Sequence, residues 1–282
     1  MAALRSQTRK WAERIAAASW IWNDTYSIGD INHLSVLMDE VLSKKVKPSL
    51  PLYGFQFIFN TQSNTRLGLD GYDNYQAPLD EDGNELYKRR MWVSGYLEFV
   101  DLPPKTGDVV LCSEIVLSVR CLGSNAFVGI AREFQRGESV ILRETRTLLY
   151  TNEPYNDQKS DLILQQRQFS HSTIIKLSLA QLMRFNALSY NLHKIHHDKA
   201  FCMRENLKTV IVSGPFLVLI MLRYFALVYP NLRIGQFKYK NREPCYIDEG
   251  VTLGINVVEG GYLVEFVKDG RVKCGGMITI RD

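Results

Sequence analysis

The most constraining feature of the sequence is a long apolar segment in its second half, residues 210–229. Gly214, Pro215 and Arg223 interrupt it, and its longest purely apolar run, 216–222, is far shorter than the ~18 residues that a transmembrane helix requires. A segment this apolar that is too short to span a bilayer is best accommodated inside a protein core. It therefore predicts a buried helix around which a domain packs, and no membrane span.

Both ends of this helix are marked. Ser213 is a favoured N-cap residue, Pro215 stands in the first turn where its missing N–H costs nothing, and Pro230 stops the helix. Four strand-like runs follow, separated in part by the turn pairs Gly260-Gly261 and Asp269-Gly270: 234–240, 251–257, 261–268 and 273–280. A long apolar helix followed by an antiparallel meander is typical of the α+β class, with the sheet wrapped around the helix.

The chain reads as two halves of similar size that meet at a polar, turn-rich stretch, 151–160. Strand-like runs in the first half cover 92–100, 107–119, 126–134 and 140–150. The second half opens with a short strand at 174–177 and a helix at 179–186 that Ser178 caps. The first half shows no central helix as clear as the one that begins at Ser213.

The net charge of +4 is concentrated at the N-terminus, where residues 1–20 carry +3 and leave +1 for the rest of the chain. This balance argues against a nucleic-acid-binding face. The same segment combines Arg, Ser and Ala with a single acid, Glu13, which is typical of mitochondrial presequences; a basic surface helix is the alternative. No uninterrupted apolar stretch follows the first basic residues, as a secretory signal would require.

The cysteines favour a reducing compartment. They are odd in number and widely spaced, and none forms a CxxC pair, so neither a disulfide framework nor a zinc site is indicated. The five are Cys112, Cys121, Cys202, Cys245 and Cys274.

Four of the five histidines lie between residues 171 and 197, and three of them fall within 191–198. His193 and His197 are spaced i, i+4, so on a helix they would share a face, with Asp198 as a third metal ligand. The sequence has no HExxH order and no distant Cys/His pair to complete such a site. A surface loop that happens to be rich in histidine and a segment that carries a general base are the other two interpretations.

This segment, RFNALSYNLHKIHHD at 184–198, resembles the pattern RFSALTFNxHRIHYD of a MaoC-like subgroup. That subgroup contains the fungal mitochondrial 3-hydroxyacyl-thioester dehydratases and the mesaconyl-C4-CoA hydratases. Further matches follow in the same order along the chain: LPLY at 50–53, LGLDG at 67–71, RRMW at 89–92 with Gly95, LEF at 97–99, VSGPF at 212–216 and FKYKNREP at 237–244. The roles of Arg89 and Arg90 stay open, with internal ion pairs as one possibility.

The resemblance implies a double hot-dog fold, in which two repeats of a helix wrapped by an antiparallel sheet are fused in one chain. It divides the sequence into a basic extension at 1–19 (a candidate short presequence), a degenerate repeat at 20–152 and a catalytic repeat at 161–282. It covers about residue 20 to the C-terminus.

The family reaction is reversible loss of water from a (3R)-3-hydroxyacyl thioester to give the trans-2-enoyl thioester. The resemblance assigns the catalytic base to His196, whose ordinary pKa near 6.5 suits proton transfer near neutral pH. Asn191 stands where broader relatives carry Asp; it cannot act as a base but can orient a water or the 3-hydroxyl. Gly214, at the start of the buried helix, is the candidate oxyanion donor through its N–H. We expect a single-base mechanism.

Five further residues are candidates for substrate binding. His193 matches the subgroup pattern and suits a structural or a catalytic role, and Ser213 replaces a family histidine. Asp198 either orients a histidine or caps a turn, and His197 replaces a family tyrosine. Lys238, Lys240 and Arg242 alternate along one predicted strand and therefore project from the same face. They would suit the phosphates of coenzyme A or an acidic carrier protein; the alternative is a solvated edge strand protected by its lysines. The five candidates are His193, Ser213, Lys238, Lys240 and Arg242.

The function these observations favour is a 3-hydroxyacyl-thioester dehydratase of mitochondrial type II fatty acid synthesis, located in the matrix. We expect an acyl-CoA or acyl-carrier-protein thioester as substrate, no metal or other cofactor, and a homodimer as one possible assembly. A mesaconyl-C4-CoA-type hydratase remains an alternative. A thioesterase is less favoured, because it would need a carboxylate to activate water at the thioester carbonyl and Asn191 carries an amide. A catalytically silent hot-dog protein that binds a carrier protein or scaffolds a complex is the alternative from another class.

Overall fold

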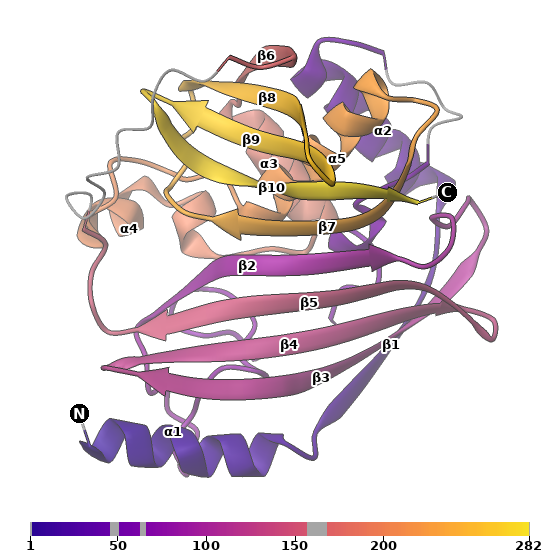
Figure 1. The fold of residues 1–282 in the computed structure, drawn as a ribbon. Coiled ribbons are helices and arrows are strands. Elements are labelled where there is room, and N and C mark those ends of the chain that lie inside the picture. The colour runs from indigo at the N-terminus through magenta and orange to yellow at the C-terminus, as the bar shows by residue number, and fades with distance from the viewer. Residues whose placement is uncertain (1, 46–50, 63–65, 157–167, 282) are drawn as a thin grey trace.

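The computed structural model describes residues 2–45, 51–62, 66–156 and 168–281, and within them ten strands form one antiparallel sheet (Figure 1). The strand order is β1-β3-β4-β5-β2-β7-β10-β9-β8-β6. The strands of the first half are β1 Ser19–Thr25, β2 Arg89–Phe99, β3 Val109–Leu122, β4 Asn125–Arg136 and β5 Ser139–Thr151. Those of the second half are β6 His171–Lys176, β7 Arg233–Asn241, β8 Gly250–Val258, β9 Gly261–Lys268 and β10 Arg271–Arg281. The strands expected from the sequence are confirmed, with boundaries shifted by a few residues.

The two halves have the same topology. Counted from its outer edge, the first half runs β1-β3-β4-β5-β2 and the second runs β6-β8-β9-β10-β7. They join where β2 pairs with β7, from Ser94 opposite Lys240 to Glu98 opposite Gln236. Two equivalent sheets fused edge to edge, with helices packed on them, confirm the predicted α+β double hot-dog.

The apolar segment of the second half forms α5, Gly214–Val228. Ser213 stands at its N-cap in an extended conformation and Pro215 lies in its first turn, as predicted. Every residue from 216 to 226 is buried, so the helix is the core element that its composition indicates. One detail differs: Ser213 Oγ makes no capping hydrogen bond, and it is a buried oxygen without a hydrogen-bond partner in the described structure.

Helix α3, Leu179–Leu188, packs against α5. Ser178 caps it as expected, and Gln181 completes a capping box with that serine. The rings of Phe185 and Phe216 stack with their centroids 4.3 Å apart, which joins α3 to the start of α5. This contact fixes the end of α3 relative to the segment that follows it.

The first half contains a helix that the sequence did not reveal, α2 at Ile28–Leu42, capped by Ser27. It lies between β1 and β2, as α3 lies between β6 and β7, and it packs beside α3 and α5. Where the second half has α5, the first half has only the single 3-10 turn η1, Phe55–Phe57, among its described residues. Gly54, with φ of 87°, lies so close to α5 that an added Cβ would be 2.2 Å from Leu219 Cδ1.

A buried ion-pair cluster occupies the sheet of the first half. Arg132 on β4 lies 2.8 Å from Glu114 on β3 and 3.2 Å from Glu144 on β5. Its guanidinium also donates to the backbone oxygens of Gln56 and Asn60, beside η1. Arg132 thereby connects β3, β4 and β5 to the segment that contains η1.

The N-terminal segment forms α1, Ala2–Ile15, which lies along β3 at the edge of the sheet (Figure 1). Its Trp11 and Thr8 are buried, and Thr8 Oγ1 is 2.8 Å from Tyr87 OH. Arg5 Nε donates to the carbonyl of Gly123 at 2.8 Å. The basic segment is therefore packed against the first half as a helix, whereas its cleavage as a presequence stays a prediction.

Part of the predicted boundary between the halves, 157–160, and the start of the predicted second repeat, 161–167, lie outside the described residues.

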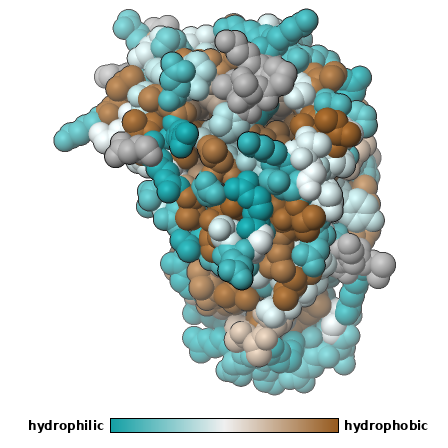
Figure 2. Space-filling model, turned by 90° about the vertical axis from the view of Figure 1, so that its right-hand side faces the viewer, coloured by the Kyte–Doolittle hydropathy of each residue, from teal (hydrophilic) through white to brown (hydrophobic). Residues whose placement is uncertain are grey.

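No helix in the described part of the chain is long and apolar enough to cross a membrane. All five cysteines are free thiols. The face on the right of Figure 1 shows hydrophobic residues gathered in patches among hydrophilic ones (Figure 2).

Candidate active site

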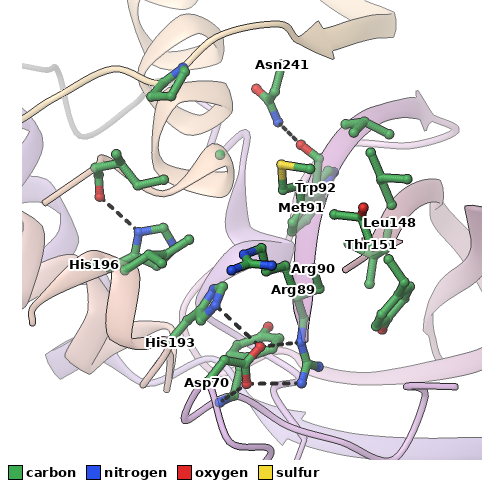
Figure 3. A pocket seen from close by; sticks show the side chains of 18 of the residues that line it. Asp70, Arg89, Arg90, Met91, Trp92, Leu148, Thr151, His193, His196 and Asn241 are labelled. Atoms are coloured by element: carbon green, nitrogen blue, oxygen red, sulfur yellow. Dashed lines mark hydrogen bonds and ion pairs between the residues drawn. The ribbon is translucent and has the colours of Figure 1, made fainter. Parts of the chain in front are cut away.

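A cavity of about 510 Å³ lies between the two halves. The first half contributes β2 residues and the loop before them, and the second contributes the histidine-rich segment and the start of α5. Figure 3 shows His193 and His196 on one side of this cavity, with Arg90, Met91 and Trp92 of β2 across from them. The candidate residues of the second half therefore face a wall built by the first.

His196 ends the short 3-10 turn η3, Lys194–His196, and is buried. Its Nδ1 lies 2.9 Å from the backbone oxygen of Ile211. A carbonyl oxygen only accepts, so Nδ1 must donate, and the lone pair of the neutral ring lies on Nε2. Burial lowers the pKa of His196 to about 4, so the ring is neutral near pH 7. Nε2 of His196 is therefore an unprotonated nitrogen that can accept a proton.

Asn191 lines the same cavity, and its orientation is fixed by the backbone. Its Oδ1 accepts a hydrogen bond from the N–H of His193 at 3.0 Å, and its own N–H donates to Asn186 O at 2.9 Å. Because the backbone N–H can only donate, the amide oxygen is the end that faces it. The Nδ2 group is thereby left as the donor that Asn191 offers to a bound molecule.

His193 contacts a carboxylate from the other half. Its Nε2 lies 3.3 Å from Oδ2 of Asp70, and its ring centroid is 5.4 Å from that of His196. Burial lowers the pKa of His193 to about 3, although the charge of Asp70 acts in the opposite direction. His193 is thus a second neutral imidazole in the cavity.

Gly214 lines the cavity at the first residue of α5. An added Cβ there would lie 2.7 Å from Nδ2 of Asn241, whose amide donates to the Trp92 carbonyl at 2.9 Å. This close approach explains why the position suits glycine. Ser213, by contrast, is fully buried and does not line the cavity in the described structure.

The structure brings only one of the three candidate cations to the cavity. Arg242 lines it, whereas Lys238 and Lys240 are exposed on β7 and alternate with buried Phe237 and Tyr239. The alternation predicts that all three cations share one face of a strand. The two lysines do, on the outer face of the sheet, whereas Arg242 lies beyond the end of β7 and lines the cavity. The edge-strand alternative is wrong, because β7 pairs with both β2 and β10. Phosphate binding by these cations stays a prediction.

The remaining polar residues of the histidine-rich segment have structural contacts. Asp198 caps α4, Lys199–Arg204, by accepting from the N–H of Phe201 at 2.9 Å. His197 Nε2 lies 3.1 Å from Leu192 O. Among the described residues, no group of three or more His, Cys, Asp and Glu is placed to hold a metal ion.

Two residues of the site were not identified from the sequence as candidates. Asp70 lies in the quoted motif LGLDG and is buried, and Arg90 in RRMW pairs with it, Nε to Oδ2, at 2.7 Å. The ion-pair alternative for the two arginines is thus confirmed, since Arg89 pairs with Glu205. Their place in shared motifs was the only signal, because the partners are far apart in the sequence.

The chain resembles known proteins in sequence and in fold. A family model described as hydroxyacyl-thioester dehydratase type 2 matches residues 54–247. The mitochondrial protein of that name from Saccharomyces cerevisiae is 29% identical over 255 residues, which cover 84% of this chain and 87% of the relative. Its counterpart from Schizosaccharomyces pombe is 24% identical, with 81% and 84% covered.

Among solved structures, the MaoC-like dehydratase from Phytophthora capsici superimposes with a TM-score of 0.68 at 16% identity. The superposition covers 96% of this chain and 99% of that one, which shows that the folds are shared. The family model spans well over half of the sequence. The chain therefore belongs to the hydroxyacyl-thioester dehydratase type 2 family.

Proposed function

We propose that the protein is a hydro-lyase that reversibly dehydrates (3R)-3-hydroxyacyl thioesters to trans-2-enoyl thioesters. The observation that carries this proposal is the neutral, buried His196, whose Nδ1–H is held by the Ile211 carbonyl so that Nε2 is free to act as a base. Asn191 and Gly214, the first residue of α5, line the same cavity. Family membership supplies the reaction class that these groups fit.

In this mechanism one histidine moves one proton. Nε2 of His196 takes the proton from C2, and the electron pair of that C–H bond moves toward the thioester carbonyl as an enolate. The enolate then collapses to the C2–C3 double bond, the C3–O bond breaks, and the imidazolium returns the proton to the departing oxygen. Water leaves and His196 is neutral again, which balances the reaction. Asn191 holds the 3-oxygen through Nδ2.

Gly214 supports the enolate in this proposal. It is the first residue of α5, where backbone N–H groups lack partners within the helix and the helix dipole is positive. Gly214→Ala should lower kcat by about 10- to 100-fold, since its Cβ would push Asn241 and the start of α5 out of position. Steady-state kinetics measure this effect.

The matched control is Gly29→Ala, because that glycine lies in α2 and an added Cβ meets nothing closer than 3.9 Å. It should leave kcat unchanged. Equal activity of the two variants would contradict the role of Gly214.

The pH profile should reflect the low pKa of His196. The base is active when neutral, and burial holds its pKa at about 4. Lowering the pH from 8 to about 5 should therefore leave kcat/KM nearly constant, with the fall coming as the pH approaches 4. An ordinary imidazole would lose half its activity near pH 6.5. A midpoint near 6.5 in initial rates measured from pH 4 to 9 would rule out a buried neutral base.

The protein is proposed to act in the mitochondrial matrix, in type II fatty acid synthesis. The family relatives from both yeasts are named as mitochondrial, and the basic N-terminal helix is consistent with import. Its thioester substrate is carried by coenzyme A or by an acyl carrier protein. Steady-state kinetics with the same enoyl group on each carrier would distinguish the two, and analytical ultracentrifugation would test the proposed homodimer.

Hydration of crotonyl-CoA by the purified protein, followed by loss of the enoyl absorbance, tests the proposed reaction. Turnover would support it. No turnover with crotonyl-CoA, longer enoyl-CoAs or carrier-protein thioesters would favour the silent binding protein.

A further inference from the structure

The second half lacks a carboxylate at the cavity position held by Asn191, and the first half places one nearby. We infer that Asp70 supplies this missing carboxylate across the boundary between the halves, and that it acts through His193, which holds the 3-oxygen of the substrate. His193 is then a catalytic residue and Asp70 a positioning residue. The inference rests on the proposed dehydratase function and deepens it.

The loop that carries Asp70 is joined to the histidine-rich segment by the backbone and the side chain of Lys194. The N–H of Lys194 donates to Asp70 O at 2.8 Å, and Lys194 Nζ donates to Leu69 O at 2.7 Å. Gly71, with φ of 83°, lies so close that an added Cβ would be 2.7 Å from the oxygen of Leu192. The Asp70–His193 contact is therefore part of a fixed register between the two halves.

Asp70 is held in a single orientation. Arg90 donates to both carboxylate oxygens, Nε to Oδ2 at 2.7 Å and an Nη to Oδ1 at 3.1 Å. The N–H of Tyr72 donates to Oδ1 at 3.0 Å. Although burial acts in the other direction, the charge of Arg90 and the N–H of Tyr72 hold the pKa of Asp70 below its usual value. An ionised carboxylate so placed can only accept, so it selects the His193 tautomer that carries its proton on Nε2.

This tautomer gives the cavity a complementary set of groups for one oxygen atom. The lone pair of His193 lies on Nδ1, that of His196 lies on Nε2, and Asn191 offers the Nδ2 donor. In the hydroxyacyl complex the 3-hydroxyl donates to His193 and accepts from Asn191. After elimination the new water donates one hydrogen to each histidine and still accepts from Asn191. His193 holds the oxygen throughout and transfers no proton.

The first test compares Asp70→Asn, His193→Gln and the double variant. Asp70→Asn should lower kcat by about 100-fold with KM within about 3-fold, because the tautomer is lost while the cavity remains. If Asp70 acts through His193, the double variant should be no slower than His193→Gln alone. Glu249→Gln is the control, since this carboxylate pairs with Lys208 and Lys268 away from the cavity.

Two kinetic outcomes overturn the inference while the proposed function stands. One is a folded Asp70→Asn variant whose kcat stays within about 3-fold of that of the wild type. The other is a double variant whose loss is the product of the two single losses, which would mean independent roles. Thermal unfolding curves for each variant establish that the kinetics refer to folded protein, because the Asp70→Asn substitution leaves Arg90 without its charged partner.

A second test is independent of turnover and of the stability of the variants. The protein has only five histidines, so ¹⁵N-labelled imidazoles can be assigned by NMR. In the wild type at pH 7, His193 should be neutral with its proton on Nε2, and His196 neutral with its proton on Nδ1. A His193 that is charged, or protonated on Nδ1, would overturn the inference. Absence of turnover with every thioester would instead reject the proposed function.

Discussion

Replacing His196 with alanine is expected to abolish nearly all hydration of crotonyl-CoA, with kcat reduced by at least about 10³-fold. The ring supplies the only nitrogen in the proposed mechanism that takes the C2 proton, and its Nδ1 is already committed to the Ile211 carbonyl. Alanine removes that nitrogen, and the other neutral imidazole, His193, is assigned to the 3-oxygen and not to the C2 proton. Loss of the enoyl absorbance, followed in initial-rate assays of wild type and variant, measures the effect.

His197→Ala is the matched control for this experiment. The two histidines are neighbours in sequence, but Nε2 of His197 contacts Leu192 O and the residue does not line the cavity in the described structure. We expect its kcat to stay within about 3-fold of the wild-type value, the usual range for a substitution outside the machinery. If His197→Ala were the inactive variant, or if His196→Ala retained a tenth of the activity, the base assignment would be wrong.

The second large effect concerns stability. Arg132→Met should reduce the free energy of unfolding by about 3–5 kcal/mol, because it leaves the buried carboxylate of Glu114 without its cation. Glu144 keeps its pair with Arg146. Such a loss is a substantial share of the ~5–15 kcal/mol that separates folded from unfolded proteins. Urea denaturation followed by circular dichroism would measure it, with the midpoint and slope fitted separately.

Arg143→Met tests whether burial is the cause. Arg143 on β5 also pairs with two carboxylates, Glu98 and Glu133, but its side chain is 51% exposed, against 3% for Arg132. Water and salt screen these pairs, so the variant should unfold at nearly the wild-type urea concentration. Comparable destabilisation by both variants would show that burial does not increase the cost of removing the arginine.

The predictable parts of the fold are those in which the buried residues recur in the sequence at the spacing of a helix or a strand. The apolar run 216–222 of α5, between Ser213 and Pro230, and the alternation along β2 and β4 need no tertiary information to be recognised. Helix α2 was missed because its buried positions begin only at Leu34. Gly29, Asp30 and the residues up to His33 dilute the apolar stripe at its start.

Contacts between segments that are far apart in the chain were harder to predict from the sequence. Alternation places Lys238 and Lys240 on one face, but only the packed sheet shows that this face is the outer one. Asp70 gave no periodic signal, since it lies in a loop rich in glycine and polar residues. Its pairing with His193 depends on how the two halves dock, which local patterns do not encode.

The two halves share one strand order and are joined in one chain through the pairing of β2 with β7. This fusion removes a constraint that an assembly of identical subunits must obey. In a symmetric dimer every substitution appears twice, so neither copy can specialise. Here, within the described residues, one copy keeps the long helix and the histidines while the other has a single turn and an arginine cluster. Asp70 and His193 can therefore meet once per chain, as an asymmetric pair whose two members evolve under separate selection.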